Sequence, residues 1–548
     1  MFRCPLPVLA AGLLVVLLPP ALPAAGTQQS TVRVSVASDG RQGNGDSESF
    51  GLSADGRYVA FASRASNLVP GDTNGTWDVF VHDRLTGVTV RASVNSAGVQ
   101  GDGASRRPAL SANGRYVAFE SYASNLDPRD TNGTYDVFVH DLVTRTTGRV
   151  SLPTRKNHSN GASVYPAISA DGRFVAFKSD ASNLVPNDNN QTVDIFVRDR
   201  FTGETELISQ STDGRIGNGL CREPGLDASG RFVVFMSDAD NLVPGDTNGV
   251  PDIFVRDRQT GITERVSTGS HGEQADDQSV YGSLSAGGRY VVFKSRAENL
   301  VPGDANRQYD VFLKDRLTGL TELVSLGWDG RQGNGGSKRP AISSNGRYVV
   351  FKSDAGNLVP QDTNGVTDIF LRDRRQGTTV RVSVSSDWHQ GDDWSMRPLI
   401  SADGRTIVFW SAAGNLVPGD TNRAEDVFVR DRGPGSETTT DTIVLAAPPL
   451  HPAGQPLTLF WAGAPAGGDW WLAWSESAAG SRIQGHPLDL GPDRTVLASG
   501  RIRSDGTGTW QVGSVPAAMK GRRVWFELAA QARDGSWRDS NPVSVRFE

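Results

Sequence analysis

A short acidic loop motif is the feature of this sequence with the clearest chemistry. It has the form Asp-x-Asn-x-x-x-Asp and first occurs at Asp72, Asn74 and Asp78. Clustered carboxylate and amide oxygens suit a hard cation, above all Ca²⁺, with backbone carbonyls and water completing the shell. Asp and Asn side chains also cap turns by bonding to nearby backbone groups. The motif therefore predicts either calcium loops or capped turns, and both interpretations stay open.

The motif occurs seven times, so a calcium cofactor would bind in a series of equivalent loops. The loop resembles the Asp-rich calcium loops of dockerins and integrin propellers, but its fifth position carries Thr76, Val250, Gln308 or Ala424 in place of an acid. A single active site would break the symmetry of the copies, so residues repeated in all of them favour a structural role. The hypothetical metal ligands are Asp72, Asn74, Asp78, Asp130, Asn132, Asp136, Asp188, Asn190, Asp194, Asp246, Asn248, Asp252, Asp304, Asn306, Asp310, Asp362, Asn364, Asp368, Asp420, Asn422 and Asp426.

These loops belong to a longer repeat with a period of 58 residues. The string SADGRYVAF starts at Ser53, and equivalents start at Ser111, Ser169, Asp227, Ser285, Ser343 and Ser401. Each copy is expected to form four strands, as in PALS (108–111), RYVAFES (115–121), DVFVHD (136–141) and TERVS (263–267). The middle two are apolar without strict alternation, which is typical of strands covered on both faces. Stacked propeller blades cover their sheets in this way.

The two ends of the repeat region complement each other. The seventh copy stops at Arg432 without a fourth strand, whereas TVRVSV (31–36) precedes the first copy and has no blade of its own. Completing the last blade with this N-terminal strand removes two free sheet edges. The sequence thus predicts an all-β chain, with a seven-bladed β-propeller over 27–432 that is closed by its N-terminal strand.

The repeat resembles the TolB-type propeller repeat, a WD-repeat-like unit of exported bacterial proteins. The resemblance rests on P-A-x-S-x-D/N-G-R and the later D-R-x-T-G, and it covers about residues 31–432. It implies a TolB-like propeller of the bacterial cell envelope. Members of this group include protein-interaction modules and the gating domains of some serine peptidases, so the resemblance implies the fold more firmly than the function.

The variable positions of the repeat indicate a candidate binding site. The two tight turns of each blade should lie on one face and the two long loops on the other, where variation is tolerated. Residues just before the first strand should line the mouth of the central channel on the long-loop face. A basic funnel with aromatic residues would attract anionic groups, and the alternative is an ordinary solvated rim. The candidate ligand-binding residues are Arg106, Arg107, Tyr165, Arg222, Tyr281, Lys338, Arg339 and Arg397, and Glu48 and Glu223 share their positions.

No catalytic residues are predicted. The sequence contains neither HExxH nor GxSxG. His82 and His140 occupy a position that is Arg or Lys in other copies, which favours solvated strand residues. Cys221 occupies a position that is Ser in the other six copies, which favours a plain serine substitute over a nucleophile.

The ends of the chain carry further predictions. Arg3, the apolar run 8–18 and the small residues Ala24 and Ala25 predict a signal peptide over 1–25, and therefore a secreted or periplasmic, cell-envelope location. No second long apolar run follows, so no membrane span is expected after signal cleavage. The segment 433–441 is interpreted as a linker, and strand-like runs over 442–548 predict a small β-sandwich-like domain.

These features favour a binding or scaffold protein over an enzyme. The partner would be a protein or an anionic carbohydrate at the long-loop face, with calcium rigidifying the loops. A net charge of −6 argues against a nucleic-acid partner, and we expect a monomer. The alternative function is a carbohydrate-active enzyme, a lyase or hydrolase, that uses the channel mouth.

Overall fold

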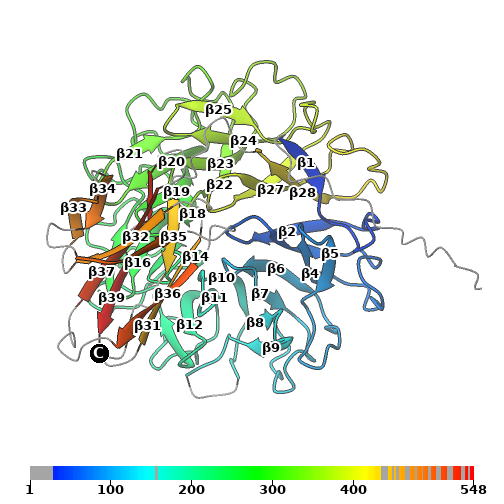
Figure 1. The fold of residues 1–548 in the computed structure, drawn as a ribbon, viewed down its shortest axis with the longest axis horizontal. Coiled ribbons are helices and arrows are strands. Elements are labelled where there is room, and N and C mark those ends of the chain that lie inside the picture. The colour runs from blue at the N-terminus through cyan, green and yellow to red at the C-terminus, as the bar shows by residue number, and fades with distance from the viewer. Residues whose placement is uncertain are drawn as a thin grey trace, which may run out of the picture.

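A computed structural model of the chain describes residues 29–154 and 158–433, together with the strands between 442 and 547. Within 29–433 the strands form seven four-stranded antiparallel sheets arranged as blades around a ring (Figure 1). The predicted seven-bladed β-propeller is therefore confirmed. The proposed signal peptide (1–25) and most of the proposed linker (433–441) lie outside the described residues. A search of the described part of the chain finds no helix with the length and apolarity needed to cross a membrane.

Each blade is built from consecutive strands, and the first of them is innermost. The strands of blades 1 to 3 are β2 (Ser47–Leu52), β3 (Tyr58–Ser63), β4 (Asp78–Asp83), β5 (Val88–Arg91), β6 (Ser105–Leu110), β7 (Tyr116–Ser121), β8 (Asp136–Asp141), β9 (Thr146–Arg149), β10 (Ser163–Ile168), β11 (Phe174–Ser179), β12 (Asp194–Asp199) and β13 (Glu204–Leu207).

The remaining blades repeat this order, except that the last borrows its outer strand. Their strands are β14 (Cys221–Leu226), β15 (Phe232–Ser237), β16 (Asp252–Asp257), β17 (Ile262–Arg265), β18 (Ser279–Leu284), β19 (Tyr290–Ser295), β20 (Asp310–Asp315), β21 (Thr321–Leu323), β22 (Ser337–Ile342), β23 (Tyr348–Ser353), β24 (Asp368–Asp373), β25 (Thr378–Arg381), β26 (Ser395–Ile400), β27 (Thr406–Ser411), β28 (Asp426–Asp431) and β1 (Ser30–Arg33).

The two middle strands of each blade carry the core. In blade 1, Phe61 on β3 pairs with Phe80 on β4, and their ring centres are 5.8 Å apart. An equivalent stacked or tilted pair recurs in every blade. The apolar clusters join neighbouring blades, so that Val59 of blade 1 packs with Val427 of blade 7. Cover on both faces explains why these strands lack apolar–polar alternation.

The first strand of each blade starts earlier than predicted and contains a bulge. PALS was expected to begin at Pro108, whereas β6 begins at Ser105, because the Ser105 hydroxyl bonds to that of Ser121 and its N–H donates to the Trp77 carbonyl. The register of β6 against β7 shifts between Arg106 and Ala109. The candidate channel-mouth residues therefore lie within the inner strands, at their long-loop ends, rather than before them.

The ring is closed at two levels. On the outside, β1 pairs antiparallel with β28, with Val32 opposite Val429, which confirms the predicted closure by the N-terminal strand. On the inside, a circuit of backbone hydrogen bonds links the tight turn after each first strand to the next, and the last runs from Ala402 N–H to the Ala54 carbonyl at 2.9 Å. The residues of this circuit are Ala54, Ala112, Ala170, Ala228, Ala286, Ser344 and Ala402.

The two long loops lie on the same face and bind each other. The Asn67 side chain donates to the Gln42 carbonyl at 2.9 Å and accepts from the Asn44 N–H at 3.0 Å. Leu68 anchors this loop in the core with 2% of its surface exposed. The loops of the long-loop face are thus joined by hydrogen bonds into one layer.

The C-terminal strands form a further all-β region, as predicted. Its centre is β37, which pairs with β32, β38 and β39, while β29 pairs with β31 and β38. The strands are β29 (Thr442–Ala446), β30 (Leu450–His451), β31 (Pro456–Ala462), β32 (Asp469–Ser475), β33 (Ala478–Ile483), β34 (His486–Leu490), β35 (Thr495–Arg501), β36 (Gly508–Ser514), β37 (Arg523–Gln531), β38 (Trp537–Ser540) and β39 (Val543–Phe547).

Candidate functional site

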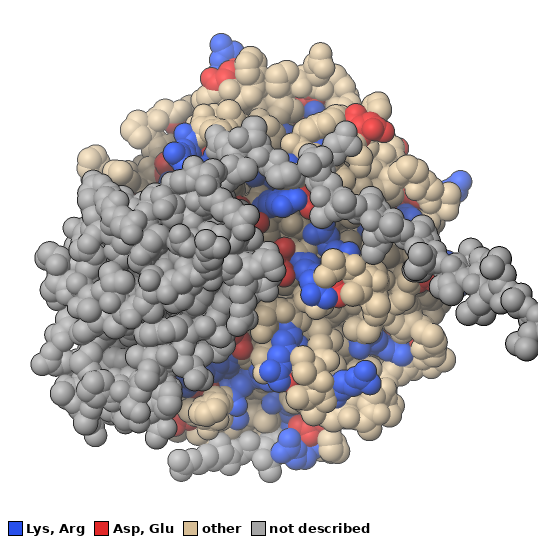
Figure 2. All heavy atoms as spheres, in the orientation of Figure 1, with Lys and Arg blue, Asp and Glu red and all other residues tan. Residues whose placement is uncertain are grey.

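The bulge residues of six blades line one cavity at the centre of the ring. The cavity has a volume of about 300 Å³. Each of these residues has a φ between 49° and 60°, a left-handed conformation that costs a residue with a side chain about 1 kcal/mol. On the part of this face that Figure 2 leaves visible, Lys and Arg side chains lie near the centre of the ring. The six residues are Arg107, Tyr165, Glu223, Tyr281, Arg339 and Arg397.

Most of the predicted ligand-binding residues converge on this cavity, and three do not. Arg107, Tyr165, Tyr281, Arg339 and Arg397 line it. Three candidates lie elsewhere, because each is the regularly paired residue just before the bulge and does not line this cavity. Arg106 lines a second cavity of about 370 Å³, which shares four lining residues with the first, and lies 3.6 Å from Glu48. Arg222 pairs with Asp238 at 3.4 Å and Lys338 with Asp354 at 3.2 Å.

A tyrosine orients an arginine on one side of the cavity. The Arg107 guanidinium carbon lies 3.8 Å from the centre of the Tyr165 ring. Arg107 also donates to Glu120 at 3.0 Å, and the second oxygen of Glu120 accepts from the Tyr165 N–H at 2.9 Å. Stacking and ion pairing together limit the rotamers of the Arg107 side chain. The side chain therefore loses less conformational entropy when it binds an anion.

A related cluster occupies the opposite side of blade 4. The Arg339 guanidinium carbon lies 3.7 Å from the Tyr281 ring centre, and Arg339 donates to the Tyr281 hydroxyl at 2.8 Å. Glu223, from blade 4, lies 3.9 Å from Arg339. From blade 2 to blade 6 the bulge residues therefore read Arg, Tyr, Glu, Tyr, Arg, with the glutamate in the middle.

Charged residues on the second strands complete the site, and the sequence analysis missed them. The Lys178 ammonium lies 4.7 Å from the Tyr165 ring centre, and that of Lys294 lies 4.5 Å from the Tyr281 ring centre. The sequence contains a signal for these residues, because one position of the otherwise apolar second strand varies in size and charge between blades. Its residues are Ala62, Glu120, Lys178, Met236, Lys294, Lys352 and Trp410.

Positive charges crowd one another in this site. Burial, and then Arg339, lower the pKa of Lys294 to about 8. Burial lowers the pKa of Arg397, and the guanidinium groups of Arg339 and Arg107 lower it further. Burial raises the pKa of Glu223. An anion in the cavity would relieve the repulsion among these cations, so the arrangement can attract and hold an anionic group.

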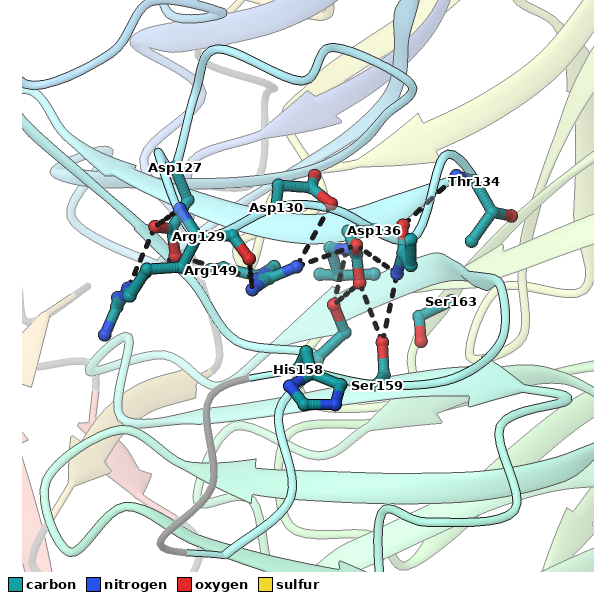
Figure 3. Close-up of polar contacts among 12 residues, drawn as sticks. Asp127, Arg129, Asp130, Thr134, Asp136, Arg149, His158, Ser159 and Ser163 are labelled. Atoms are coloured by element: carbon teal, nitrogen blue, oxygen red, sulfur yellow. Dashed lines mark hydrogen bonds and ion pairs between the residues drawn. The ribbon is translucent and has the colours of Figure 1, made fainter.

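The acidic loops contain an arginine that their local sequence does not reveal. In blade 2 the fully buried Arg149 side chain lies 3.2 Å from both Asp130 and Asp136 (Figure 3). It is the last residue of the outer strand β9. The equivalent residue bridges both acids of the loop in four further blades, at N–O distances of 3.0 to 3.5 Å. These arginines are Arg33, Arg91, Arg265 and Arg381.

The asparagine of each loop caps the turn. In blade 2, Asn132 donates to Asp136 at 2.8 Å and accepts from the Thr134 N–H at 3.1 Å. The same two bonds occur in all seven blades. Turn capping therefore accounts for the recurrence of the motif. Among the described residues, no group of three or more His, Cys, Asp or Glu side chains is placed to hold a metal.

Two blades lack the bridging arginine. Blade 5 has Leu323 at this position, and Gln332 donates there to Asp304 at 2.6 Å and Asp310 at 3.0 Å. Blade 3 has Leu207 in place of the arginine and Ile216 in place of the glutamine. Burial raises the pKa of Asp194, an acid of the blade 3 loop, to about 6.

Two histidines that were expected to be solvated are buried. His82 and His140 have 7% and 4% of their surfaces exposed, and each Nδ1 lies within 2.9 Å of a threonine hydroxyl. Their position packs against the preceding blade, where the equivalent Arg256 donates to the Gln210 carbonyl. Burial lowers the pKa of both histidines.

Cys221 behaves as its repeat position suggests. Its sulfur lies 3.2 Å from the Ser237 hydroxyl, where the other blades pair two serines. The side chain is fully buried, and burial raises the pKa of the thiol to about 12. Since the thiolate is the reactive form, burial and the raised pKa favour a structural role for this residue.

Comparison with known proteins assigns no family to this chain. No protein-family profile and no curated protein matches the sequence. Similar solved structures include TolB from Agrobacterium tumefaciens, at 14% identity over 54% of this chain and 88% of that chain with a TM-score of 0.33. The WD40 repeats of RRP9 are similar at 11% identity over 73% and 97%, with a TM-score of 0.39. Trypanosoma rangeli sialidase in complex with the inhibitor DANA is similar at 11% identity over 94% and 88%, with a TM-score of 0.30. The seven blades of the structure itself confirm the β-propeller that the repeat predicts.

Proposed function

We propose that this protein is an exported binding propeller that holds an anionic ligand in the mouth of its central channel. The observation that carries the proposal is the convergence of Arg107, Arg339 and Arg397 on one cavity. Guanidinium groups are planar donors that match carboxylates and other oxyanions in geometry as well as charge. The chain as a whole carries a net charge of −6, so the basic cavity concentrates the attraction for anions at one place.

The partner is a protein or an anionic carbohydrate that approaches the long-loop face. Support comes from the position of the bulge residues at the long-loop ends of the inner strands. The proposed signal peptide supports a secreted or periplasmic location in the cell envelope, where such ligands occur. The connected long-loop layer gives the partner a rigid surface.

Retention on immobilised polymers tests the proposal. At low salt the mature protein should be retained on polygalacturonate or polyglutamate and pass through neutral dextran. Arg339→Met should weaken binding at least about tenfold, because it removes a guanidinium that lines the cavity. The control is Arg258→Met, which removes an arginine that pairs with Glu206 outside the cavity. Equal binding by the wild type and Arg339→Met would contradict the proposal.

Calcium is proposed only for the loop of blade 3. In five blades an arginine already supplies the positive charge between the acids and would repel a second cation, and in blade 5 the Gln332 amide donates to both acids in its place. The blade 3 loop offers Asp188, Asn190 and Asp194 without that arginine. Calcium should raise the melting temperature by a few degrees relative to EDTA, and Asp188→Asn should abolish this rise. An identical melting temperature in calcium and EDTA would rule out the ion.

A further inference from the structure

The central cavity offers a hydrogen-bond acceptor as well as donors. Glu223 lies among the arginines, and its Oε1 is 3.9 Å from Arg339. Its Oε2 is buried and accepts no hydrogen bond of good geometry from the described residues, and the Tyr281 hydroxyl is the neighbouring group that interacts with this carboxylate. A buried carboxylate oxygen that lacks a well-placed donor has lost its hydration without gaining a hydrogen bond, which costs free energy. A ligand that brings a hydroxyl group would satisfy this oxygen, whereas a bare anion would be repelled by it.

The wall of the cavity offers few backbone donors. In five blades the bulge residue is followed by a proline that also lines the cavity. Proline has no N–H, so these positions cannot form the backbone ladder by which an extended peptide adds to a sheet. Recognition must come from the side chains of the bulge residues. The prolines are Pro108, Pro166, Pro224, Pro340 and Pro398.

The size of the cavity restricts the ligand. Its volume of about 300 Å³, together with the adjoining cavity of about 370 Å³ that shares four of its lining residues, is within the range for small-molecule sites. On the tight-turn side, a circuit of backbone hydrogen bonds that includes Ala54 and Ala402 links the inner strands. The cavity therefore suits a small ligand or the terminal unit of a larger one. The rings of Tyr165 and Tyr281 each already contact an arginine and a lysine, so stacking on a ligand ring is not the basis of recognition.

We propose that the ligand is a hydroxylated carboxylate, an acidic sugar at the end of a glycan. Its carboxylate is bound by Arg107, Arg339 and Arg397, and one of its hydroxyl groups donates to Glu223. This inference rests on the proposed function and narrows it, since Glu223 makes the site selective among anions.

Calorimetry on the full mature chain with three small ligands tests the class of ligand. Galacturonate has both the carboxylate and the hydroxyls, galactose lacks the carboxylate, and cyclohexanecarboxylate lacks the hydroxyls. Galacturonate should bind at least about tenfold more tightly than either of the others. Equal binding of the two carboxylates, or equally tight binding of N-acetyl-diglycine, would overturn this inference and leave the proposed function standing. Failure of every anion to bind would overturn both.

A variant of the acceptor separates its role from a general loss of structure. Glu223→Gln removes the charged acceptor and keeps the shape of the side chain. It should weaken the binding of galacturonate about tenfold and leave the binding of cyclohexanecarboxylate unchanged or tighter, because a negative charge near the ligand's carboxylate is lost.

Misfolding would weaken the binding of both ligands, and so would Arg339→Met. Glu206→Gln, which removes a surface ion pair with Arg258, is the matched control and should change neither affinity. A parallel loss of both ligands in a Glu223→Gln protein that melts at the wild-type temperature, or no change in either ligand, would overturn the inference.

Discussion

Arg149 has no exposed side-chain surface and lies 3.2 Å from two carboxylates, so its guanidinium compensates charges that would otherwise be costly to bury. Asp136 is fully buried, and it also accepts a hydrogen bond from Ser151. Burial still raises the pKa of Asp130 to about 6, with Asp136 adding to the effect. The ion pair is thus a structural element of the loop, and its partners belong to different strands.

Removing this arginine should destabilise the propeller in a pH-dependent way. Arg149→Leu leaves Asp130 and Asp136 without their cation, at a cost of about 3 kcal/mol at pH 8. Because the pKa of Asp130 is above its unfolded value, its stabilising contribution is present at low pH and is lost as the pH rises through 6. Without the arginine this loss grows, so the destabilisation at pH 8 should exceed that at pH 4.5. Denaturant unfolding of wild type and variant at both pH values measures the difference.

Blade 3 supplies the matched comparison. Leu207→Arg places an arginine beside Asp188 and Asp194, as in five other blades, and should shift stability in the opposite direction, more at pH 8 than at pH 4.5. If Arg149→Leu lost the same stability at both pH values, packing rather than charge would explain its role.

The arginine was readable from the sequence, but not from the loop alone. It recurs at one repeat position in five of seven copies, as the acids do in all seven. The loop residues taken alone offer oxygen ligands, which indicate a bound cation. The cation within reach is a side chain on the outer strand, which only the register of the four strands brings to the acids.

At the scale of the element, the bulge in the first strand builds the site. A regular strand would alternate its side chains between the two faces of the sheet, whereas the bulge inserts an extra residue and turns one side chain to the channel in each of six blades. The conformation is strained for Arg, Tyr and Glu, which carry no intrinsic preference for positive φ. The sequence therefore identifies the variable positions, but not the backbone geometry that selects one of two neighbours for the cavity.

Glycine and alanine substitutions at two adjacent residues test this strain. At Arg107, with φ 50°, Gly should be more stable than Ala by about 1 kcal/mol, because both remove the same side chain and only Gly adopts positive φ freely. At Arg106, whose φ is not positive, Ala should be the more stable by about 0.5 kcal/mol. Unfolding midpoints of the four variants give the two differences. The same sign at both residues would contradict the left-handed bulge.

At the scale of the whole molecule, the constant repeat predicted nearly everything about the propeller. Seven copies at one spacing predict the seven blades. The two incomplete ends predict the closure, because the N-terminal strand lacks a blade and the last blade lacks a fourth strand. Only the charged residues of the first strands were predicted to lie near the channel. The lysines and the glutamate of the second strands were missed, because these segments are otherwise apolar and indicate a buried core. Lys352 lines the second cavity, whereas Lys178, Lys294 and Glu120 contact side chains that line the first.

Closure by β1 should control the stability of the entire ring. Val34 is buried and its N–H donates to the Val427 carbonyl, while Arg33 pairs with Asp420 and Asp426. A chain that begins at residue 37 loses these contacts, exposes the edge of β28 and leaves two acids uncompensated. It should unfold with at least about 5 kcal/mol less stability than a chain that begins at residue 29, and it should aggregate more readily.

A peptide of residues 29–38 should restore the stability of the shortened chain in a saturable manner, because an edge strand accepts a matching strand from solution. The same peptide with Val34→Asp should not, since the aspartate would enter the core between blades 7 and 1. Melting curves at increasing peptide concentration measure the effect. An unchanged melting temperature in the shortened chain would show that the ring closes without this strand, and equal rescue by both peptides would show that the rescue does not depend on the core contact of Val34.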